Sequence, residues 1–334
     1  MSDQLFTVAP SPHIHQELTV PKVMQTVVIA MLPALAMAVY NFGAGALYVT
    51  ALSVVFCVAT EYVIVKYLLK KDITIKDSSA IVTGMLLAFN VPSNLPWHII
   101  LIGSVVAMGL GKLSFGGLGN NPFNPALVGR VFLLLSFPVQ MTRWPLPGNR
   151  LSIDGETGAT VLGLLKEGLR TGESVEKITS SFPKWTDFLL GLQGGSLGEM
   201  SALALLLGFG FMLYRKVISW HIPVTMIATV FLMTGIFWLI DPHRYANPVF
   251  HILTGGVMLG AIFMATDYVT SPFTHKGMVI FALGIGIITV VIRLFGSYPE
   301  GVSFAILIMN AFVPLINKYA HGRRFGEGVE KSKT

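Results

Sequence analysis

Residues 154–160, with the sequence DGETGAT, combine two glycines with two threonine hydroxyls. Gly155 and Gly158 allow the backbone to turn tightly and to come close to a bulky group. Thr157 and Thr160 place hydroxyls directly before an apolar run. Taken alone, this pattern is typical of a helix N-cap, because a threonine ahead of an apolar run commonly accepts from a free N–H group.

A second polar, glycine-bearing stretch, residues 116–125, contains the pairs Asn121-Pro122 and Asn124-Pro125. Each pair is typical of an N-cap followed by proline at the first helical position. Irregular backbone at membrane depth is tolerated only where it is buried in protein or lines a cavity. Helix N–H groups would then face the cavity, which suits an anion or a carbonyl-rich ring. The alternative is a plain helix start in a connecting loop.

Two carboxylates lie within or next to apolar runs. Asp267 follows a glycine-bearing run, residues 255–266, and a carboxylate there is costly unless it is paired or hydrated. The alternative is a helix end at the membrane interface. Glu61 lies inside the second apolar run, close to Lys66. A snorkelling interfacial pair of these two is favoured over an ion or proton site.

Metal and thiol chemistry have little support. His13 and His15 form an H-x-H without further ligands, which is a weak metal signal. The single cysteine, Cys57, excludes disulfides, thiolate metal sites and cysteine-ligated iron–sulfur clusters within this chain. The sequence shows no glycine-rich nucleotide-binding loop, no nucleophile–base pair and no metal-binding helix motif.

The composition is that of an integral membrane protein. The chain has 334 residues, of which 53% are hydrophobic and 12% charged. Apolar runs of about 20 residues recur along it, and each is long enough to cross a bilayer. The polar start of the chain predicts no cleaved signal peptide. The net charge of +6 is explained by cationic loops on one membrane face and does not indicate nucleic acid.

Hydropathy predicts an all-α polytopic protein with about ten transmembrane helices and some broken helices. The expected spans are residues 23–40, 46–69, 79–89, 97–110, 126–139, 200–214, 222–240, 250–264, 278–295 and 302–316. The expected regions are an N-terminal segment (1–22), a first transmembrane half (23–141), a long loop (142–198), a second half (199–318) and a tail (319–334).

An even number of spans places both termini on one side of the membrane. With the N-terminus inside, most cationic loop residues fall inside, and the short outer loops contain little beyond Arg244. The long loop with Thr160 is therefore expected on the extracytoplasmic side. Five spans on each side of this loop predict an inverted repeat. The third span of each half begins similarly, with IVTG at residues 81–84 and ILTG at 252–255.

Several stretches in order along the chain resemble the NqrB/RnfD family, whose members are membrane subunits of the Na+-translocating NADH:quinone reductase and of the Rnf complex. They are SPH at residues 11–13, Lys112 with FGGLGN at 115–120, FNPA at 123–126, DGETGAT at 154–160 and FMATD at 263–267. The resemblance covers nearly the whole chain. The short N-terminal extension is similar to the Rnf branch.

The resemblance implies two flavins. In that family the last threonine of a Ser/Thr-Gly-Ala-Thr motif carries FMN through a phosphoester, which corresponds here to Thr160, with Thr157, Gly158 and Ala159 completing the motif. The linkage uses only the phosphate, so the protein around the isoalloxazine ring sets its redox properties. The family also binds a non-covalent riboflavin in the membrane part. Its candidate residues are Lys112, Asn120, Asn124, Arg130, Thr266 and Asp267.

The expected function is that of a flavoprotein component of an ion-translocating ferredoxin:NAD oxidoreductase in a bacterial cytoplasmic membrane. The resemblance implies electron relay across the membrane, coupled to Na+ or H+ movement. It implies partner subunits that include iron–sulfur proteins and a second covalent-FMN protein, with membrane lipid around them. This chain carries no complete site for NAD or ferredoxin. The alternative is a secondary transporter or channel with inverted repeats and no redox role.

Overall fold

The computed structural model describes residues 19–71, 75–147, 157–180, 182–183 and 185–320. The N-terminal part is helical throughout. Its elements are α1 (Val20–Phe42), α2 (Ala44–Val63), η1 (Ile64–Leu68), η2 (Ile75–Asp77), α3 (Ser79–Phe89), α4 (Trp97–Val105), η3 (Val106–Leu110), η4 (Leu113–Phe115), α5 (Pro125–Ser136) and α6 (Pro138–Thr142). Helices η1 and η3 are π-helical turns that extend α2 and α4, whereas η2 and η4 are 3₁₀ turns.

The rest of the chain contains a connecting region and a second group of long helices. The connecting region comprises β1 (Trp144–Pro145), β2 (Thr157–Gly158), α7 (Val161–Arg170), α8 (Val175–Thr179) and α9 (Trp185–Leu190). The second group comprises α10 (Ala202–Tyr214), α11 (His221–Ile240), α12 (Pro248–Leu253), α13 (Val257–Leu259), the π-helical η5 (Gly260–Met264), α14 (His275–Phe295) and α15 (Val302–Tyr319).

The chain is a multi-pass membrane protein. Within the described residues, six helical segments are long and apolar enough to cross a membrane, and three shorter apolar helices accompany them. The six are Val20–Phe42, Ala44–Leu68, Trp97–Phe115, His221–Ile240, His275–Phe295 and Val302–Tyr319. The all-α, polytopic architecture expected from hydropathy is thus confirmed. All ten expected spans coincide with helical segments, while the count of ten crossings stays a prediction.

A backbone break interrupts the segment that hydropathy presents as one span at residues 250–264. Helix α12 ends at Leu253, and α13 begins only at Val257. Between them, Gly255 and Gly256 have φ angles of 68° and 66°. Glycine adopts this left-handed region without the steric penalty of a side chain. One of the expected broken helices is therefore present here. Helix α3, which is the third expected span of the first half, is continuous.

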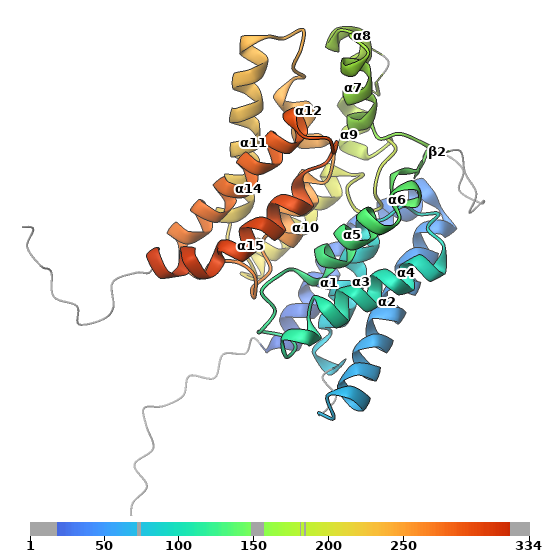
Figure 1. Cartoon of the computed structure of the whole chain (residues 1–334), viewed down its shortest axis with the longest axis vertical. Helices are drawn as coiled ribbons and strands as arrows, with labels where there is room; N and C mark the ends of the chain where they lie inside the picture. Colours follow the sequence, from blue (N-terminus) through green and yellow to red (C-terminus); the bar gives the residue numbers. More distant parts are fainter. Residues whose placement is uncertain (1–18, 72–74, 148–156, 181, 184, 321–334) are drawn as a thin grey trace, which may run out of the picture.

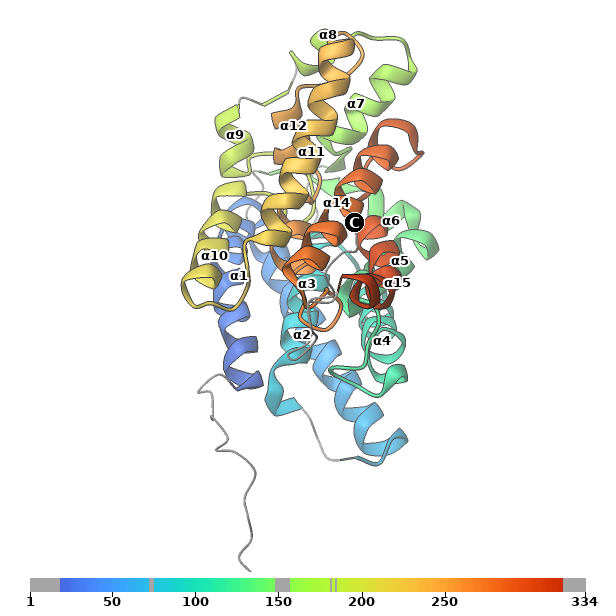
Figure 2. The ribbon, with the colours of Figure 1, turned by 90° about the vertical axis from the view of Figure 1, so that its left-hand side faces the viewer.

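The connecting region lies at one end of the molecule, where α7 and α8 stand beside one end of α11 (Figures 1 and 2). Its strands β1 and β2, the only strands among the described residues, pair antiparallel, with Trp144 opposite Gly158. A separate cluster of buried apolar side chains links this region to α12. It contains Val161, Leu162, Leu165, Val175, Ile178, Phe188, Ala246 and Phe250. The region expected as one long loop is thus a packed subdomain.

The N-terminal and C-terminal groups of helices share one apolar core. Buried residues of α1, α3 and α5 belong to the same cluster as those of α10, α11, α14 and α15. Helix α1 packs along α10, and α5 contacts α15. The first of these contacts is close: a Cβ added to Gly208 of α10 would lie 2.4 Å from the carbonyl oxygen of Ala30 in α1.

Candidate functional site

Thr160 is the N-cap of α7. Its Oγ1 accepts a hydrogen bond of 3.1 Å from the Gly163 N–H, so the capping geometry predicted from sequence is present. Its side chain is only 7% exposed. The side chain is buried because β1 pairs with the residues just ahead of it and α7 packs into the core of the connecting region. Residues 154–156 of the motif lie outside the described part.

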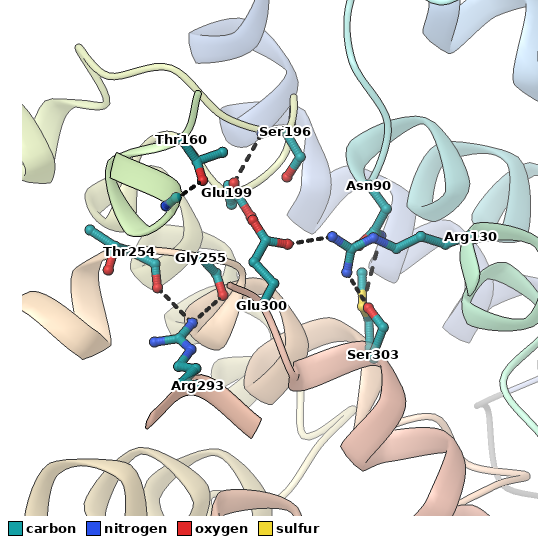
Figure 3. A network of polar contacts seen from close by, with 12 residues as sticks. Asn90, Arg130, Thr160, Ser196, Glu199, Thr254, Gly255, Arg293, Glu300 and Ser303 are labelled. Carbon is teal, nitrogen blue, oxygen red and sulfur yellow. Dashed lines mark hydrogen bonds and ion pairs between the residues drawn. The ribbon is translucent and has the colours of Figure 1, made fainter. Parts of the chain in front are cut away.

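The Thr160 side chain borders a cavity of about 50 Å³. Arg130 of α5 lines this cavity together with aromatic and polar residues of β1 and α15. Among the other lining residues are Met141, Trp144, Tyr298, Glu300, Ser303 and Phe304. Arg130 donates to Glu300 at 2.5 Å and also to the Ser303 hydroxyl. Figure 3 shows how this network approaches Thr160 from the side of α15.

Glu199, in the loop ahead of α10, lies next to the same residues (Figure 3). Its Oε1 accepts from the Ser196 N–H at 3.0 Å. Burial, and secondly the nearby carboxylate of Glu300, raise the pKa of Glu199. Thr160 and Glu199 also line one small crevice that reaches Gly255 in the helix break. Proton-accepting and cationic groups therefore surround the Thr160 position.

Arg293 of α14 satisfies the carbonyls at the broken helix. It donates to the carbonyl oxygens of His251 at 2.6 Å and Thr254 at 2.9 Å, and also to that of Gly255. The last carbonyls of a helix have no partner within it and carry the negative end of its dipole. A buried guanidinium can donate hydrogen bonds to these carbonyls, and its positive charge offsets the negative end of the dipole. Arg293 thus holds the break in place beside the Thr160 region.

A second cavity, of about 70 Å³, lies among α1, α3, the start of α5 and the turn after η5. It brings together four of the residues expected at a membrane flavin: Lys112, Asn124, Thr266 and Asp267. Leu118 and Asn121 also line it, so part of the irregular 116–125 stretch borders a cavity as expected. Burial raises the pKa of Asp267, whose Oδ2 accepts from Thr270 at 3.1 Å.

The other two candidates lie elsewhere. Arg130 belongs to the cavity beside Thr160, and Asn120 is exposed and lines neither cavity. Asn124 is an N-cap as predicted, because its side chain accepts from the N–H groups of Ala126 and Leu127. Asn121-Pro122 does not begin a helix, since the Asn121 amide instead donates to the Phe123 carbonyl.

The predicted pairing of Glu61 with Lys66 is wrong. Glu61 is 1% exposed and forms an ion pair of 2.8 Å with Lys112, which also donates to Ser79 at 2.6 Å. Lys66 lies on the exposed π-helical turn and donates to Tyr62. Residues His13 and His15 lie outside the described part, and no group of metal-ligating side chains occurs among the residues that the structure describes.

Sequence reasoning missed Glu199, Arg293, Glu300 and Trp144. Arg293 had a usable signal, because a charged residue inside an apolar run is functional by default. Trp144, Glu199 and Glu300 lie in polar surroundings, where nothing local distinguishes them from surface residues. Only the tertiary structure brings them next to Thr160 and Arg130.

The sequence model of the NQR2, RnfD, RnfE family matches residues 7–326 of this chain. The D subunit of the Na(+)-translocating ferredoxin:NAD(+) oxidoreductase complex of Acetobacterium woodii is 48% identical, over 98% of this chain and 97% of the relative. The corresponding D subunit of the proton-translocating complex of Clostridium ljungdahlii is 44% identical, over 96% of each chain. The D subunit of an ion-translocating oxidoreductase complex of Stutzerimonas stutzeri is 41% identical, over 93% of each.

Proposed function

This chain belongs to the NQR2, RnfD, RnfE family, and on that premise we propose that it is the D subunit of a ferredoxin:NAD oxidoreductase complex that translocates ions. The observation that carries this proposal is the similarity to subunits of that name over nearly the full length of both chains. The named relatives differ in their ion, Na+ in one and the proton in another. We therefore propose Na+ or H+ as the coupling ion.

We further propose that Thr160 carries FMN as a phosphoester. The surroundings suit such a group in three respects. Thr160 begins a ten-residue helix, whose N-terminal N–H groups favour a phosphate. The adjoining cavity has aromatic walls in Trp144, Tyr298 and Phe304. It also contains polar atoms without partners, the Nε of Arg130 and the Oε1 of Glu300. Buried polar atoms are normally hydrogen-bonded, so these atoms fit a polar ligand.

The chain's own residues would bind and orient the flavin. The cavity of about 50 Å³ is smaller than a flavin ring, so its walls must move to admit one. Arg130, held by Glu300 and Ser303, would contribute positive charge to the flavin site, and Glu199 would contribute a group able to hold a proton. A flavin supplies one- and two-electron redox chemistry. Thr157, Gly158 and Ala159 hold Thr160 at the end of the β1–β2 pair.

For the non-covalent riboflavin we propose the cavity lined by Lys112, Asn124, Thr266 and Asp267. This donor and acceptor set matches the polar edge of an isoalloxazine ring, and most of the remaining lining is apolar. Two flavins, near Thr160 and within the helix bundle, would allow electrons to pass between the two faces of the membrane. Partner subunits, including iron–sulfur proteins and a second covalent-FMN protein, would supply the sites for ferredoxin and NAD.

We propose ten crossings arranged as a 5+5 inverted repeat, with both termini cytoplasmic. Two helix contacts support the repeat, because α1 packs on α10 and α5 on α15, which are the first and the fifth members of each half. Cysteines at the exposed positions Ser174 and Lys216, in a Cys57→Ser background, test the orientation. An impermeant thiol reagent should label the first from outside and the second from inside. Labelling of both from one side would contradict this topology.

The test of the redox function is the flavin content of the purified complex. This chain should carry one flavin that survives denaturation, and the complex should catalyse ferredoxin-dependent NAD reduction. A secondary transporter or channel, the alternative class, predicts a colourless chain. Preparations of this protein that never contain flavin would rule out the redox proposal while leaving family membership intact.

A further inference from the structure

A third cavity, of about 460 Å³, lies on α7 and is separate from the two cavities considered above. Its walls come from α7, from residues 244–251 and from the end of α14 with the turn that follows. Five basic residues line it, namely Lys166, Arg170, Arg244, His251 and Arg293. No aspartate or glutamate is among the lining residues of the described chain. The cavity is therefore strongly cationic.

Four of the basic side chains lie at different depths in this cavity. Arg170 and Arg244 are exposed at the rim, Lys166 is half-buried, and Arg293 is buried. Burial, and secondly the charge of Arg170, lower the pKa of Lys166. None of these four side chains forms an ion pair with a carboxylate within the residues that the structure describes. Lys166 and Arg293 donate to backbone carbonyls, which leaves their positive charges unneutralised. The positive field of the four side chains therefore attracts an anion to the cavity, and the exposed Arg170 and Arg244 are free to contact it.

His251 provides an unused polar group at the base of the cavity. Its side chain is 2% exposed, and neither Nδ1 nor Nε2 has a hydrogen-bond partner in the structure. Buried side-chain nitrogens normally have a partner. In either neutral tautomer, the imidazole can donate one hydrogen bond and accept another. A buried, unpartnered imidazole that lines a cationic cavity is a suitable donor for an anionic oxygen.

The cavity lies beside the ends of two candidate membrane spans, and on the proposed topology this places it at the membrane surface. These spans are α14, which ends at Phe295, and α11, which ends at Ile240, four residues before Arg244. Most of the remaining wall is apolar and includes Leu162, Leu165, Leu169, Leu294 and Phe295. A small inorganic anion would gain nothing from this apolar wall. An amphiphile with an anionic head would use both parts of the cavity.

We propose that this cavity binds the phosphate group of an anionic phospholipid, with the acyl chains along the apolar wall. Arg170, Arg244 and Lys166 neutralise the phosphate at the rim, and His251 donates to it from below. The predicted topology leaves little other positive charge in the short loops on this side of the membrane. The cationic cluster is therefore local to the cavity.

Photolabelling tests this proposal on the purified complex in phosphatidylcholine nanodiscs. Phosphatidylglycerol with a diazirine in one acyl chain should label peptides from residues 161–170 or 293–299. Arg170→Ala and Arg244→Ala should each lower that labelling about fivefold, the effect of one basic residue at a membrane surface. Lys177→Ala is the matched control, because Lys177 is exposed in neighbouring α8 and does not line the cavity. Equal labelling in all variants, or by a phosphatidylcholine analogue, would overturn the proposal.

Two further arms separate the possible occupants. Excess unlabelled phosphatidylglycerol should displace the probe, whereas inorganic phosphate at the same concentration should not. Displacement by inorganic phosphate would show a free-phosphate site and overturn the lipid assignment. Thr160→Ala should label like wild type, because Thr160 does not line this cavity. Labelling that occurs only in Thr160→Ala would show that a group attached to Thr160 fills the cavity, and would equally overturn the proposal.

Discussion

Lys112 and Glu61 form an ion pair of 2.8 Å although their side chains are only 2% and 1% exposed. They lie 51 residues apart in the sequence. Lys112 also donates to Ser79, so one ammonium joins α2, α3 and the turn after η3. Two charges buried this deeply are stable only as a pair. Lys112 and Ser79 line the cavity that also contains Asp267.

Removal of one partner of this pair should destabilise the protein more than removal of both. We expect Glu61→Ala or Lys112→Met alone to cost roughly 3–5 kcal/mol, because each leaves a buried charge without its counter-charge. The double variant Glu61→Leu, Lys112→Met should regain much of that loss. The measurement is the temperature at which the detergent-solubilised protein loses its monodisperse peak in size-exclusion chromatography. Additive losses in the double variant would contradict this coupling.

Local patterns predicted the features that depend on neighbouring residues. Apolar runs correctly predicted helical segments. Asn124 and Thr160 are N-caps, as their positions directly before an apolar run indicate. The same reasoning failed for Glu61, because Lys66 is its neighbour in sequence whereas Lys112 is its neighbour in space. It failed for Asn121 too, since the pattern is identical to that of Asn124 and only the surrounding fold distinguishes them.

Arg293 should be needed for the break between α12 and α13. Arg293→Met leaves three carbonyl oxygens of this break without their donor, at a cost of about 1–3 kcal/mol for each group that finds no other partner. We expect a marked fall in thermal stability, measured as above. Arg215→Met, at an exposed arginine after α10, is the control and should change little. Equal stability of both variants would show that water satisfies these carbonyls.

The contact between α1 and α10 can be tested with two glycines on one helix. In Gly208→Ala the new Cβ would lie 2.4 Å from the Ala30 carbonyl oxygen, whereas Gly210→Ala meets nothing within 4 Å. Overpacking costs about 1–3 kcal/mol, whereas an unhindered Gly→Ala change in a helix gains up to about 1 kcal/mol. Thermal stability should therefore fall for Gly208→Ala and hold or rise for Gly210→Ala. The same sign for both variants would contradict the close packing.

Asp267→Asn should separate function from stability. Burial raises the pKa of this carboxyl, so the stability it contributes is present at low pH and is lost as pH rises through the raised value. Asparagine cannot ionise, and the variant should therefore be at least as stable as wild type at pH 7. Ferredoxin-dependent NAD reduction should nevertheless fall, with the complex still assembled. Normal turnover would indicate that Asp267 merely ends a helix at the interface.

The polar groups around Thr160 are the part of the site that sequence reasoning could not reach. Arg130 meets Glu300 across 170 residues, and Ser303 across 173. Contacts of this separation depend on how α5 packs against α15, which no local spacing encodes. That a flavin is attached within the motif at 157–160 stays a prediction, and the motif does not indicate that the Thr160 side chain is buried.

The covalent flavin on Thr160 makes the sharpest prediction. On a denaturing gel the wild-type band should fluoresce under ultraviolet light, because a phosphoester survives denaturation whereas a non-covalent cofactor is lost. Thr160→Ala should abolish this fluorescence. Thr157→Ser is the matched control and should retain it, since Thr157 is the competing hydroxyl beside a glycine and its substitution leaves the last threonine in place.

The capping role of Thr160 gives a second, independent readout. Its Oγ1 accepts from the Gly163 N–H, so Thr160→Ala should also cost about 1 kcal/mol of stability through the lost cap. Thr160→Ser keeps both the hydroxyl and the cap, so its stability should match that of wild type whether or not the serine carries a flavin. If Thr160→Ala lowers stability while its band still fluoresces, the attachment site is another residue and Thr160 is only a cap. If the wild-type band never fluoresces, the proposal of a covalent flavin on this protein fails.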